Sequence, residues 1–282
     1  MKKIAILGTG NIGCDLLVKC LKQEDFKIVS FSGRHASSKG LKFAKTLGVP
    51  TTDRSIQGII NGNEKPDIII DATSALHHKE NYKIAKDNGI RMIDMTPAKI
   101  GLSCCPVVNL NSCLKGDNIN MISCGGQAAL PICFAIKNIN QNINYIEAVS
   151  TISSASAGPA TRKNISQYIA STEAAISNLL KIEKVKIMLN ITPALPPIEM
   201  KTSILVKAKD IEDISKTREE IDYISKKTRK YIPGYKNIIP LSSVGNKCIC
   251  QIQIHGSGDY LPTYAGNLDI INCAAIEVIK KL

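Results

Sequence analysis

Cys124 carries the clearest chemical signal among the ten cysteines of this 282-residue chain. It stands directly before Gly125 and Gly126, and an apolar stretch of helical spacing follows at residues 128–136. A sulfur at the start of a helix lies near the positive end of the helix dipole, which lowers the pKa of a thiol and favours the nucleophilic thiolate. The sequence therefore predicts that Cys124 is a catalytic nucleophile.

The other cysteines lack this setting. Four lie within apolar helical patterns, which predicts inert side chains in the core: Cys14, Cys20, Cys133 and Cys273. Cys104 and Cys105 precede Pro106 in a loop-like stretch and are second-rank candidates. Neither this pair nor Cys248 and Cys250 has the paired two-residue spacing of structural zinc sites, so we expect no metal.

A second signal is a glycine pattern near the start of the chain. It follows a short apolar run, residues 3–7, and opens a segment of helical spacing, residues 15–21. In the dinucleotide fingerprint the first glycine allows a tight turn, the second lets the pyrophosphate approach the backbone, and the third lets the helix pack on the strand. The N–H groups at the start of the helix then face the phosphates. We therefore expect a dinucleotide to contact Gly8, Thr9, Gly10, Asn11, Ile12 and Gly13.

The second strand of such a unit, expected at residues 26–31, normally ends near an acidic residue that binds the ribose hydroxyls. Here Ser32, Gly33, Arg34 and His35 follow it, and none of them is a carboxylate. Arg34 could pair with a 2′-phosphate instead, so NADP is a candidate beside NAD.

A thiolate beside a bound nicotinamide suggests the oxidation of an aldehyde. The sulfur attacks the aldehyde, the thiohemiacetal gives a hydride to the nicotinamide, and the thioester passes its acyl group to an acceptor. Water as the acceptor gives an acid, and CoA gives an acyl-CoA. The residues alone do not choose between these acceptors.

These residues require strands and helices that position them. The expected elements alternate in the first part of the chain, with strands at residues 3–7, 26–31, 68–71 and 90–94 and helices at 15–21, 40–47 and 78–88. This alternation predicts an α/β fold built on a Rossmann-type, doubly wound parallel sheet.

The pattern changes after residue 123, where a second domain is expected to begin. Its expected elements are strands at 145–153, 184–191, 202–207 and 247–254 and helices at about 164–181 and 211–230. A mixed sheet with one face covered by helices often dimerises, so we expect a homodimer. The predicted division assigns 1–123 plus 266–282, including a last helix from about Asn267, to dinucleotide binding, and 124–265 to an α+β catalytic and dimerisation domain.

Composition sets the broad class. The chain is longer than most single cores support, so two domains of roughly 120 to 150 residues are expected. Its formal net charge is +12, but the lysines are scattered and only four Phe and eight Tyr are available for stacking, which argues against nucleic-acid binding. The N-terminal apolar run meets glycines too early for a signal peptide, and no window approaches the roughly 18 apolar residues of a membrane helix. Cysteines without a secretion signal fit a reducing compartment, so we expect a cytoplasmic protein.

Seven short motifs occur between the first strand and the last helix: GTGNIG (8–13), DATSA (71–75), MIDMTPA (92–98), PVVNL (106–110), CGGQA (124–128), SAGPATR (156–162) and YAGNLDI (264–270). Together they resemble the acetylating, CoA-dependent acetaldehyde dehydrogenases. The resemblance implies oxidation of acetaldehyde with NAD and CoA, on a semialdehyde-dehydrogenase-like fold. It also implies a partner, 4-hydroxy-2-oxovalerate aldolase, from which these enzymes commonly channel acetaldehyde in the breakdown of aromatic compounds.

The resemblance also implies roles for individual residues. Cys124 matches the cysteine that forms the acyl thioester, and Asn267 matches a cofactor-contacting position, where its amide suits a nicotinamide carboxamide. A further stretch matches cofactor-contacting positions: Ser156, Ala157, Gly158, Pro159, Ala160, Thr161, Arg162, Lys163 and Asn164. This stretch contains a turn able to present N–H groups and hydroxyls, and the alternative is a plain loop that opens a helix with Arg162 in solvent.

The chain departs from the family pattern at one position. An aspartate that helps to position the cysteine or its water is expected after a Pro-Pro segment, but Thr202 stands there. Glu199 or His255 could substitute, and His77 and His78 follow a strand-end segment near the expected substrate site. The general base is therefore open, and we expect the thiol to rely on its helix end more than on a side-chain base.

Two other functions remain open. A semialdehyde or acyl-phosphate reductase shares the plan of a Rossmann sheet and a thiol, but it would need an arginine and a histidine placed for a carboxylated or phosphorylated substrate. The sequence shows no clear pair of this kind. The other alternative is a catalytically inactive NAD-binding partner that holds the aldolase, which Thr202 and the altered loop at Gly33 and Arg34 would favour.

Overall fold

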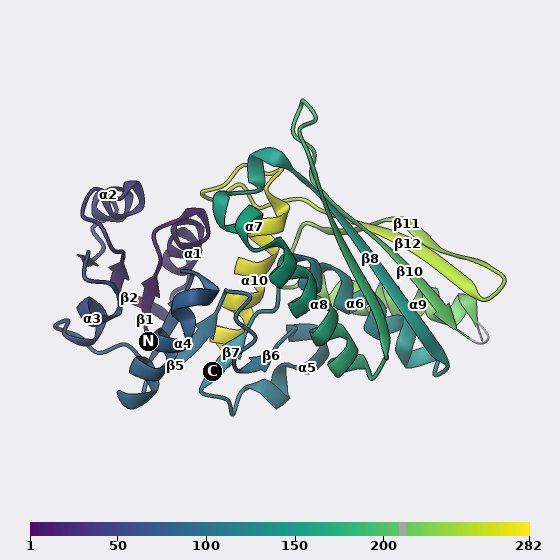
Figure 1. Cartoon of the computed structure of the whole chain (residues 1–282), viewed down its shortest axis with the longest axis horizontal. Helices are drawn as coiled ribbons and strands as arrows, with labels where there is room; N and C mark the ends of the chain where they lie inside the picture. Colours follow the sequence, from purple (N-terminus) through teal and green to yellow (C-terminus); the bar gives the residue numbers. More distant parts are fainter. Residues whose placement is uncertain (209–212) are drawn as a thin grey trace.

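The computed structural model describes residues 1–208 and 213–282, and of Pro159 and Ala160 the backbone alone. Two sheets organise the chain, one of seven strands and one of five. The seven-stranded sheet lies at the left of Figure 1 and the five-stranded sheet at the right, with the last helix, α10 (Gly266–Lys281), between them.

The seven-stranded sheet has the order β3-β2-β1-β4-β5-β7-β6, and all of its pairs are parallel. Its strands are β1 (Lys2–Leu7), β2 (Phe26–Ser32), β3 (Thr51–Thr52), β4 (Ile68–Asp71), β5 (Arg91–Asp94), β6 (Leu102–Ser103) and β7 (Asn118–Asn120). The helices between them are α1 (Asn11–Leu21), α2 (Lys39–Thr46), α3 (Ser55–Ile60), α4 (Ala75–Asp87) and α5 (Pro106–Cys113). The predicted doubly wound parallel sheet is confirmed.

Strand β1 shows why these segments read as continuous apolar runs. Its successive side chains point to opposite faces of the sheet, and both faces are covered. Ile4 and Ile6 join a core cluster with residues of α1 and α10, whereas Ala5 and Leu7 join a second cluster with residues of α3. All four are buried, which fixes the start of the glycine turn that follows β1.

The five-stranded sheet is mixed, in the order β11-β12-β10-β8-β9. Strands β8 and β9 are parallel and the other pairs are antiparallel. Its strands are β8 (Ile143–Ser153), β9 (Lys184–Thr192), β10 (Met200–Ala208), β11 (Tyr235–Val244) and β12 (Lys247–Ile254). The accompanying helices are α6 (Cys124–Ile139), α7 (Pro159–Lys163), α8 (Ile165–Leu180) and α9 (Ile214–Arg229), with a short 3-10 helix at Ser154–Ser156.

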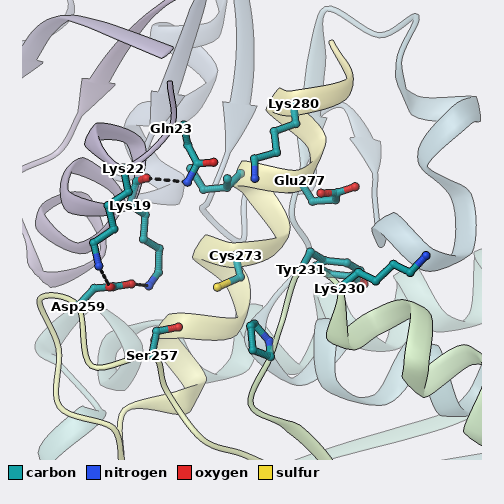
Figure 2. Close-up of a pocket in the computed structure, with 12 residues that line it drawn as sticks. Lys19, Lys22, Gln23, Lys230, Tyr231, Ser257, Asp259, Cys273, Glu277 and Lys280 are labelled. Carbon is teal, nitrogen blue, oxygen red and sulfur yellow. Dashed lines mark hydrogen bonds and ion pairs between the residues drawn. The ribbon is translucent and has the colours of Figure 1, made fainter. Parts of the chain in front are cut away.

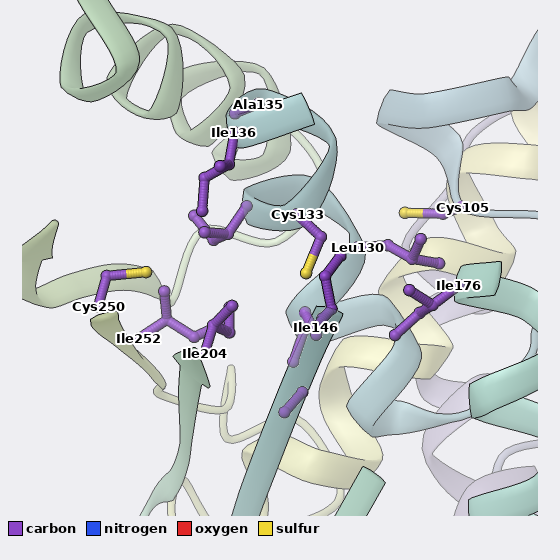
Figure 3. Close-up of a cluster of buried hydrophobic side chains, with 14 of the residues drawn as sticks. Cys105, Leu130, Cys133, Ala135, Ile136, Ile146, Ile176, Ile204, Cys250 and Ile252 are labelled. Carbon is purple, nitrogen blue, oxygen red and sulfur yellow. The ribbon is translucent and has the colours of Figure 1, made fainter. Parts of the chain in front are cut away.

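Helix α6 packs on this sheet through a large apolar cluster. Figure 3 shows side chains of α6 and of strands β8, β10 and β12 within it: Leu130, Cys133, Ile136, Ile146, Ile204 and Ile252. Each aliphatic side chain buried in this way contributes roughly 1.5–3 kcal/mol of hydrophobic free energy. This packing fixes the position of α6 and therefore of Cys124 at its start.

Several short or polar elements were absent from the prediction: β3, β6, β7, β11, α3 and α5. The helix predicted at 211–230 is observed at Ile214–Arg229, and residues 211 and 212 lie outside the described residues. Within residues 1–208 and 213–282, no helix has both the length and the apolar character needed to span a bilayer.

A buried lysine ties α1 to the C-terminal part of the chain. The Lys19 ammonium contacts Asp259, and it lies 2.7 Å from Asp269 Oδ1 of α10 and 3.4 Å from Asp15 Oδ2. Figure 2 shows Lys19 and Lys22 converging on Asp259 at the edge of a cavity that Cys273 also lines. Cys273 is therefore partly exposed, whereas the prediction placed it in the core.

Candidate active site

Cys124 is the first residue of α6, so the predicted helix behind it is confirmed. Ser123 caps this helix, because its Oγ accepts a hydrogen bond from the Gly126 N–H at 2.9 Å. The same oxygen lies 2.6 Å from Thr172 Oγ1 of α8, which joins the cap to the neighbouring helix. Cys124 is partly exposed, unlike the fully buried cysteines of the core such as Cys133.

The exposed side of Cys124 faces a cavity of about 120 Å³. Part of its wall is apolar, from residues such as Met95, Leu268 and Ile271. Hydroxyl and amide side chains complete it: Thr73, Ser74, Thr96, Ser123, Thr161, Asn164, Tyr168 and Asn267. Among the described residues that line it there is no Asp, Glu, Lys, Arg or His. The described lining of the cavity therefore carries no charged side chain.

A second, larger cavity of about 420 Å³ adjoins the first. It is lined by Gly10 and Asn11 of the glycine turn, and on other sides by Arg34, His77 and Gly158. The two cavities share six lining residues: Ile12, Ala72, Thr73, Ser74, Thr161 and Leu268. Cys124 and the glycine turn therefore open into one continuous cleft.

The glycine turn has the geometry expected of a dinucleotide loop. Gly8 has a φ of +122°, which L side chains rarely adopt, and a Cβ at Gly13 would lie 1.9 Å from the Gly8 carbonyl oxygen. A Cβ at Gly10 would meet no atom within 4 Å, so this residue leaves open space beside the backbone. Thr9 is fixed beside the turn, where its Oγ1 accepts a hydrogen bond from Ser38 Oγ at 2.7 Å.

Asn267 offers a hydrogen-bond acceptor to the smaller cavity. Asn267 is buried and lines the cavity, and its Oδ1 has no hydrogen-bond partner among the described residues. Its Nδ2 donates to the Ser156 carbonyl oxygen at 3.4 Å. A buried acceptor without a partner costs free energy, and the N–H group of a carboxamide would satisfy it.

The segment from Ser156 to Asn164 borders the same cleft. Gly158 and Thr161 line the larger cavity, and Thr161 and Asn164 line the smaller one. Ser156 is buried and its Oγ donates to the Ser153 carbonyl oxygen at 3.0 Å. The segment thus forms one wall of the cleft.

Arg162 and Lys163 are not among the described residues that line the cleft. Arg162 folds back on its own loop, donating from Nε to the Ala157 carbonyl oxygen at 3.1 Å and from Nη2 to Ser154 Oγ at 2.8 Å. Lys163 is exposed, and the side chains of Pro159 and Ala160 lie outside the described residues.

The two histidines that follow β4 lie in different surroundings. His77 Nε2 is 3.2 Å from Arg34 Nη1 at the wall of the larger cavity. His78 is buried, with Nδ1 2.9 Å from Asp71 Oδ2 and Nε2 3.2 Å from Asp94 Oδ2. Burial would lower the pKa of His78, but these carboxylates raise it overall. His78 therefore belongs to a structural network at the strand ends, and His77 lies in the cleft.

Comparison with known proteins gives relatives that match nearly the whole chain. A family model described as prokaryotic acetaldehyde dehydrogenase, dimerisation, matches residues 124–262. An acetaldehyde dehydrogenase of Pectobacterium atrosepticum is 42% identical over 282 residues, which cover 99% of this chain and 95% of that protein. Another, from Spirochaeta aurantia, is 44% identical over 280 residues, or 99% and 94% of the two chains. The chain belongs to the acetaldehyde dehydrogenase family.

The fold of this acetaldehyde dehydrogenase family member also has a solved counterpart. The crystal structure of aspartate semialdehyde dehydrogenase with NADP from Candida albicans superposes with a TM-score of 0.73, covering 99% of this chain and 98% of that chain. The sequence identity is 12%, so this likeness concerns the fold. The predicted semialdehyde-dehydrogenase-like fold is confirmed.

The ionisation of Cys124 differs from the prediction. Burial raises the pKa of the thiol to about 11, although the Tyr168 hydroxyl and the N–H of Gly125 each lower it. The expectation that the helix end gives this thiol a lowered pKa is therefore wrong. The cavity wall removes solvent from the thiolate, and this desolvation outweighs the helix terminus.

The other candidate groups of the sequence lie apart from the thiol. Glu199 accepts hydrogen bonds from Gln253 and, at 2.6 Å, from the His255 ring, so these residues form their own cluster at the ends of β10 and β12. Cys104 and Cys105 are both buried, and burial raises the pKa of Cys105 to about 12.

Tyr168 was not predicted as a site residue. Its Oη lies 3.9 Å from Cys124 Sγ. Tyr168 belongs to an amphipathic helix, where one tyrosine on the apolar side looks like an ordinary core residue. Only the meeting of α6 and α8 in space reveals it.

Proposed function

We propose that this protein converts acetaldehyde, CoA and NAD or NADP reversibly to acetyl-CoA and the reduced cofactor through a thioester on Cys124. Membership of the acetaldehyde dehydrogenase family supports the substrate. The observation that carries the mechanism is that Cys124 opens into the same cleft as the glycine turn. A thiol and a dinucleotide site that share one cleft allow covalent catalysis beside a hydride acceptor.

The chemistry of the chain's own residues follows from this placement. The Cys124 thiol gives up its proton, and the sulfur electron pair forms a bond to the aldehyde carbon while the carbonyl π pair moves to oxygen. When that pair returns, the carbon loses a hydride and the thioester remains on Cys124. The CoA thiol gives up its proton as its sulfur attacks the thioester carbon, the bond to Cys124 breaks, and the Cys124 sulfur takes the electron pair and a proton. A nicotinamide dinucleotide, when bound, supplies the hydride acceptor.

The cofactor would be held from two sides. Gly8, Gly10 and Gly13 admit the pyrophosphate to the start of α1, whose N–H groups favour an anion. Asn267 would accept a hydrogen bond from the nicotinamide carboxamide through its free Oδ1. The wall formed by Thr161 and Gly158 would close the opposite side of the cleft.

The test is the formation of NADH from acetaldehyde, followed by absorbance with and without CoA. We expect turnover that requires CoA and is abolished in Cys124→Ala, with Cys273→Ala as the matched control because Cys273 is the other partly exposed cysteine. Turnover that requires phosphate instead of CoA would identify an acyl-phosphate reductase. Absence of Cys124 acylation by acetyl-CoA would identify an inactive cofactor-binding protein.

Cofactor preference is a separate part of the proposal. Arg34 lines the larger cavity beside His77, and no carboxylate follows β2 to repel a 2′-phosphate. We expect Arg34→Ala to lower kcat/KM for NADP by about ten- to a hundredfold relative to NAD, the value of a charge-assisted hydrogen bond. Arg54→Ala, another exposed arginine, is the control. If Arg34→Ala left the ratio of kcat/KM for NADP to that for NAD unchanged, Arg34 would not contribute to cofactor preference.

The dimer is expected to form through the sheet face opposite α6. On this face the register places Leu205 beside Ile249, and Val149 beside Met188. These apolar residues are exposed or partly exposed in the single chain, and the matching family model is described as a dimerisation domain. We expect Leu205→Asp to give monomers in light scattering. Leu47→Asp, at the C-terminal end of α2 beside the other sheet, should leave the dimers intact. Dimers in both variants would show that the interface lies elsewhere.

A partner aldolase, with a place in the breakdown of aromatic compounds, remains a prediction from the family. Its test is co-purification with a 4-hydroxy-2-oxovalerate aldolase, followed by transfer of acetaldehyde in the presence of a competing aldehyde-consuming enzyme. Transfer that the competitor suppresses completely would argue against channelling.

A further inference from the structure

The hydroxyl of Tyr168 is held against the first turn of α6. The side chain is buried, and its Oη lies 3.9 Å from Cys124 Sγ. A Cβ placed on Gly125 would lie 2.0 Å from this Oη, so glycine is what allows the hydroxyl to come so close. The Gly125 N–H also donates to Oη. Tyr168 is therefore fixed beside the sulfur and keeps its own O–H free to donate elsewhere.

Two more buried hydroxyls continue inward from Tyr168. Ser150 of β8 is the neighbouring hydroxyl, because a Cβ on Gly125 would lie 2.0 Å from Tyr168 Oη and 3.2 Å from Ser150 Oγ. Ser150 Oγ lies 2.9 Å from Thr202 Oγ1, and these two residues are register partners across β8 and β10. Thr202 is also the position at which the sequence led us to expect a carboxylate. Three hydroxyls thus run from the reactive sulfur to that position.

We propose that Tyr168, Ser150 and Thr202 form a reversible hydroxyl chain that stabilises the thiolate of Cys124. This inference rests on the proposed thioester mechanism. Tyr168 is the catalytic member because it touches the reacting sulfur, and Ser150 and Thr202 are positioning residues that act through it.

The chain works because each hydroxyl can both donate and accept. With a neutral thiol, the Cys124 S–H donates to Tyr168, which donates to Ser150, which donates to Thr202. When the thiol proton leaves to water and its electron pair stays on sulfur, the hydroxyls turn. Thr202 then donates to Ser150, Ser150 to Tyr168, and Tyr168 to the sulfur. Tyr168 keeps its proton throughout, and each hydrogen bond between neighbouring hydroxyls is kept with its direction reversed.

The cavity beside Cys124 suits neutral hydroxyls better than charged side chains. Its described lining holds no acidic, basic or histidine side chain, and Tyr168 is the titratable group that faces the thiol. An acceptor-only carboxylate at position 202 would hold the Ser150 O–H toward itself, and Ser150 could then no longer donate to Tyr168. A threonine leaves both directions available.

The test measures thiolate formation without turnover. The wild type and variants are alkylated with iodoacetamide across a pH series, and modification of the Cys124 peptide is read by mass spectrometry. We expect Tyr168→Phe to slow alkylation at pH 8 by about ten- to a hundredfold, the value of a hydrogen bond to a charged group, and to move the titration midpoint upward. Tyr223→Phe, an exposed tyrosine of α9, is the matched control and should match the wild type.

The inner positions distinguish a chain from a single contact. Ser150→Ala and Thr202→Val should slow alkylation severalfold, whereas Thr202→Ser, which keeps the hydroxyl, should restore the wild-type profile. Thermal melting confirms that each variant is folded. Superimposable profiles for Tyr168→Phe and the wild type would overturn the proposal, and so would equal profiles for Thr202→Val and Thr202→Ser. Acylation of wild-type Cys124 by acetyl-CoA tests the proposed function separately, because alkylation requires no turnover.

Discussion

Replacing Lys19 by methionine should destabilise the fold far more than replacing its exposed neighbour Lys22. The Lys19 side chain is 6% exposed and contacts three carboxylates, of which Asp15 is 1% and Asp269 is 5% exposed. Methionine keeps the apolar stem but removes the ammonium, so Asp15 and Asp269 would lose the cation they contact, and only the exposed Lys22 would remain beside Asp259. Figure 2 shows both lysines at Asp259. Removing one partner of a buried ion pair costs about 3–5 kcal/mol.

Lys22 provides the matched comparison on the same helix. Its ammonium contacts Asp259, as that of Lys19 does, but the Lys22 side chain is 59% exposed. Exposed pairs contribute about 0–1 kcal/mol, because water solvates and screens both charges. The difference between the two variants therefore isolates the effect of burial from the effect of removing a lysine.

The assay is urea unfolding at one fixed protein concentration, since dimerisation would make the apparent stability depend on concentration. We expect Lys19→Met to lower the free energy of unfolding by about 3–5 kcal/mol and Lys22→Met by less than about 1 kcal/mol. At acidic pH the difference in the free energy of unfolding between the two variants should shrink, because protonated carboxylates no longer repel one another. Equal losses in the two variants would refute the idea that Lys19 neutralises a buried acidic cluster.

Three further predictions concern the cleft. Gly13→Ala should weaken NADH binding, measured by fluorescence titration, because its Cβ would lie 1.9 Å from the Gly8 carbonyl oxygen and force α1 away from the turn. Gly125→Ala should nearly abolish acetaldehyde oxidation while leaving NADH binding intact. Its Cβ would lie 2.0 Å from Tyr168 Oη and would push this hydroxyl away from the thiol. Asn267→Ala should raise the Kd for NADH, in the same titration, by about two- to tenfold, the value of one hydrogen bond. An unchanged Kd for Asn267→Ala would contradict the assignment of its free Oδ1 to the nicotinamide.

The elements that the sequence predicted are those whose signal is local. The strand, glycine turn and helix at residues 2–21 are contiguous. The apolar run and the three glycines are required by steric constraints within this segment, which no distant residue alters. Strand β11 was missed because it lies at a sheet edge, where most of its side chains are exposed and no alternation of apolar residues develops. Strands β6 and β7 were missed because two or three residues carry no periodicity.

The candidate site divides along the same line. Cys124 was predicted because the glycines and the helix that follow it are adjacent in the chain. Tyr168 and Ser150 were not, because their approach to the sulfur depends on how α8 and β8 pack against α6. The direction of the thiol pKa was also missed for this reason, since desolvation is a property of the assembled wall and not of the helix that bears the thiol.

The same wall that raises the thiol pKa bears on the choice between water and CoA as the acyl acceptor. A thioester on Cys124 would lie in a cavity of about 120 Å³, with apolar side chains such as Met95 and Ile271 along its wall. Apolar walls of this kind bind water weakly, and sites that exclude water slow the hydrolysis of reactive intermediates. A thiol on a long flexible arm can still reach the carbonyl carbon, and thiolates attack thioesters readily. If the proposed thioester forms, the apolar wall that disfavours ionisation of the Cys124 thiol would also favour acyl transfer to a thiol over loss of the acyl group to water.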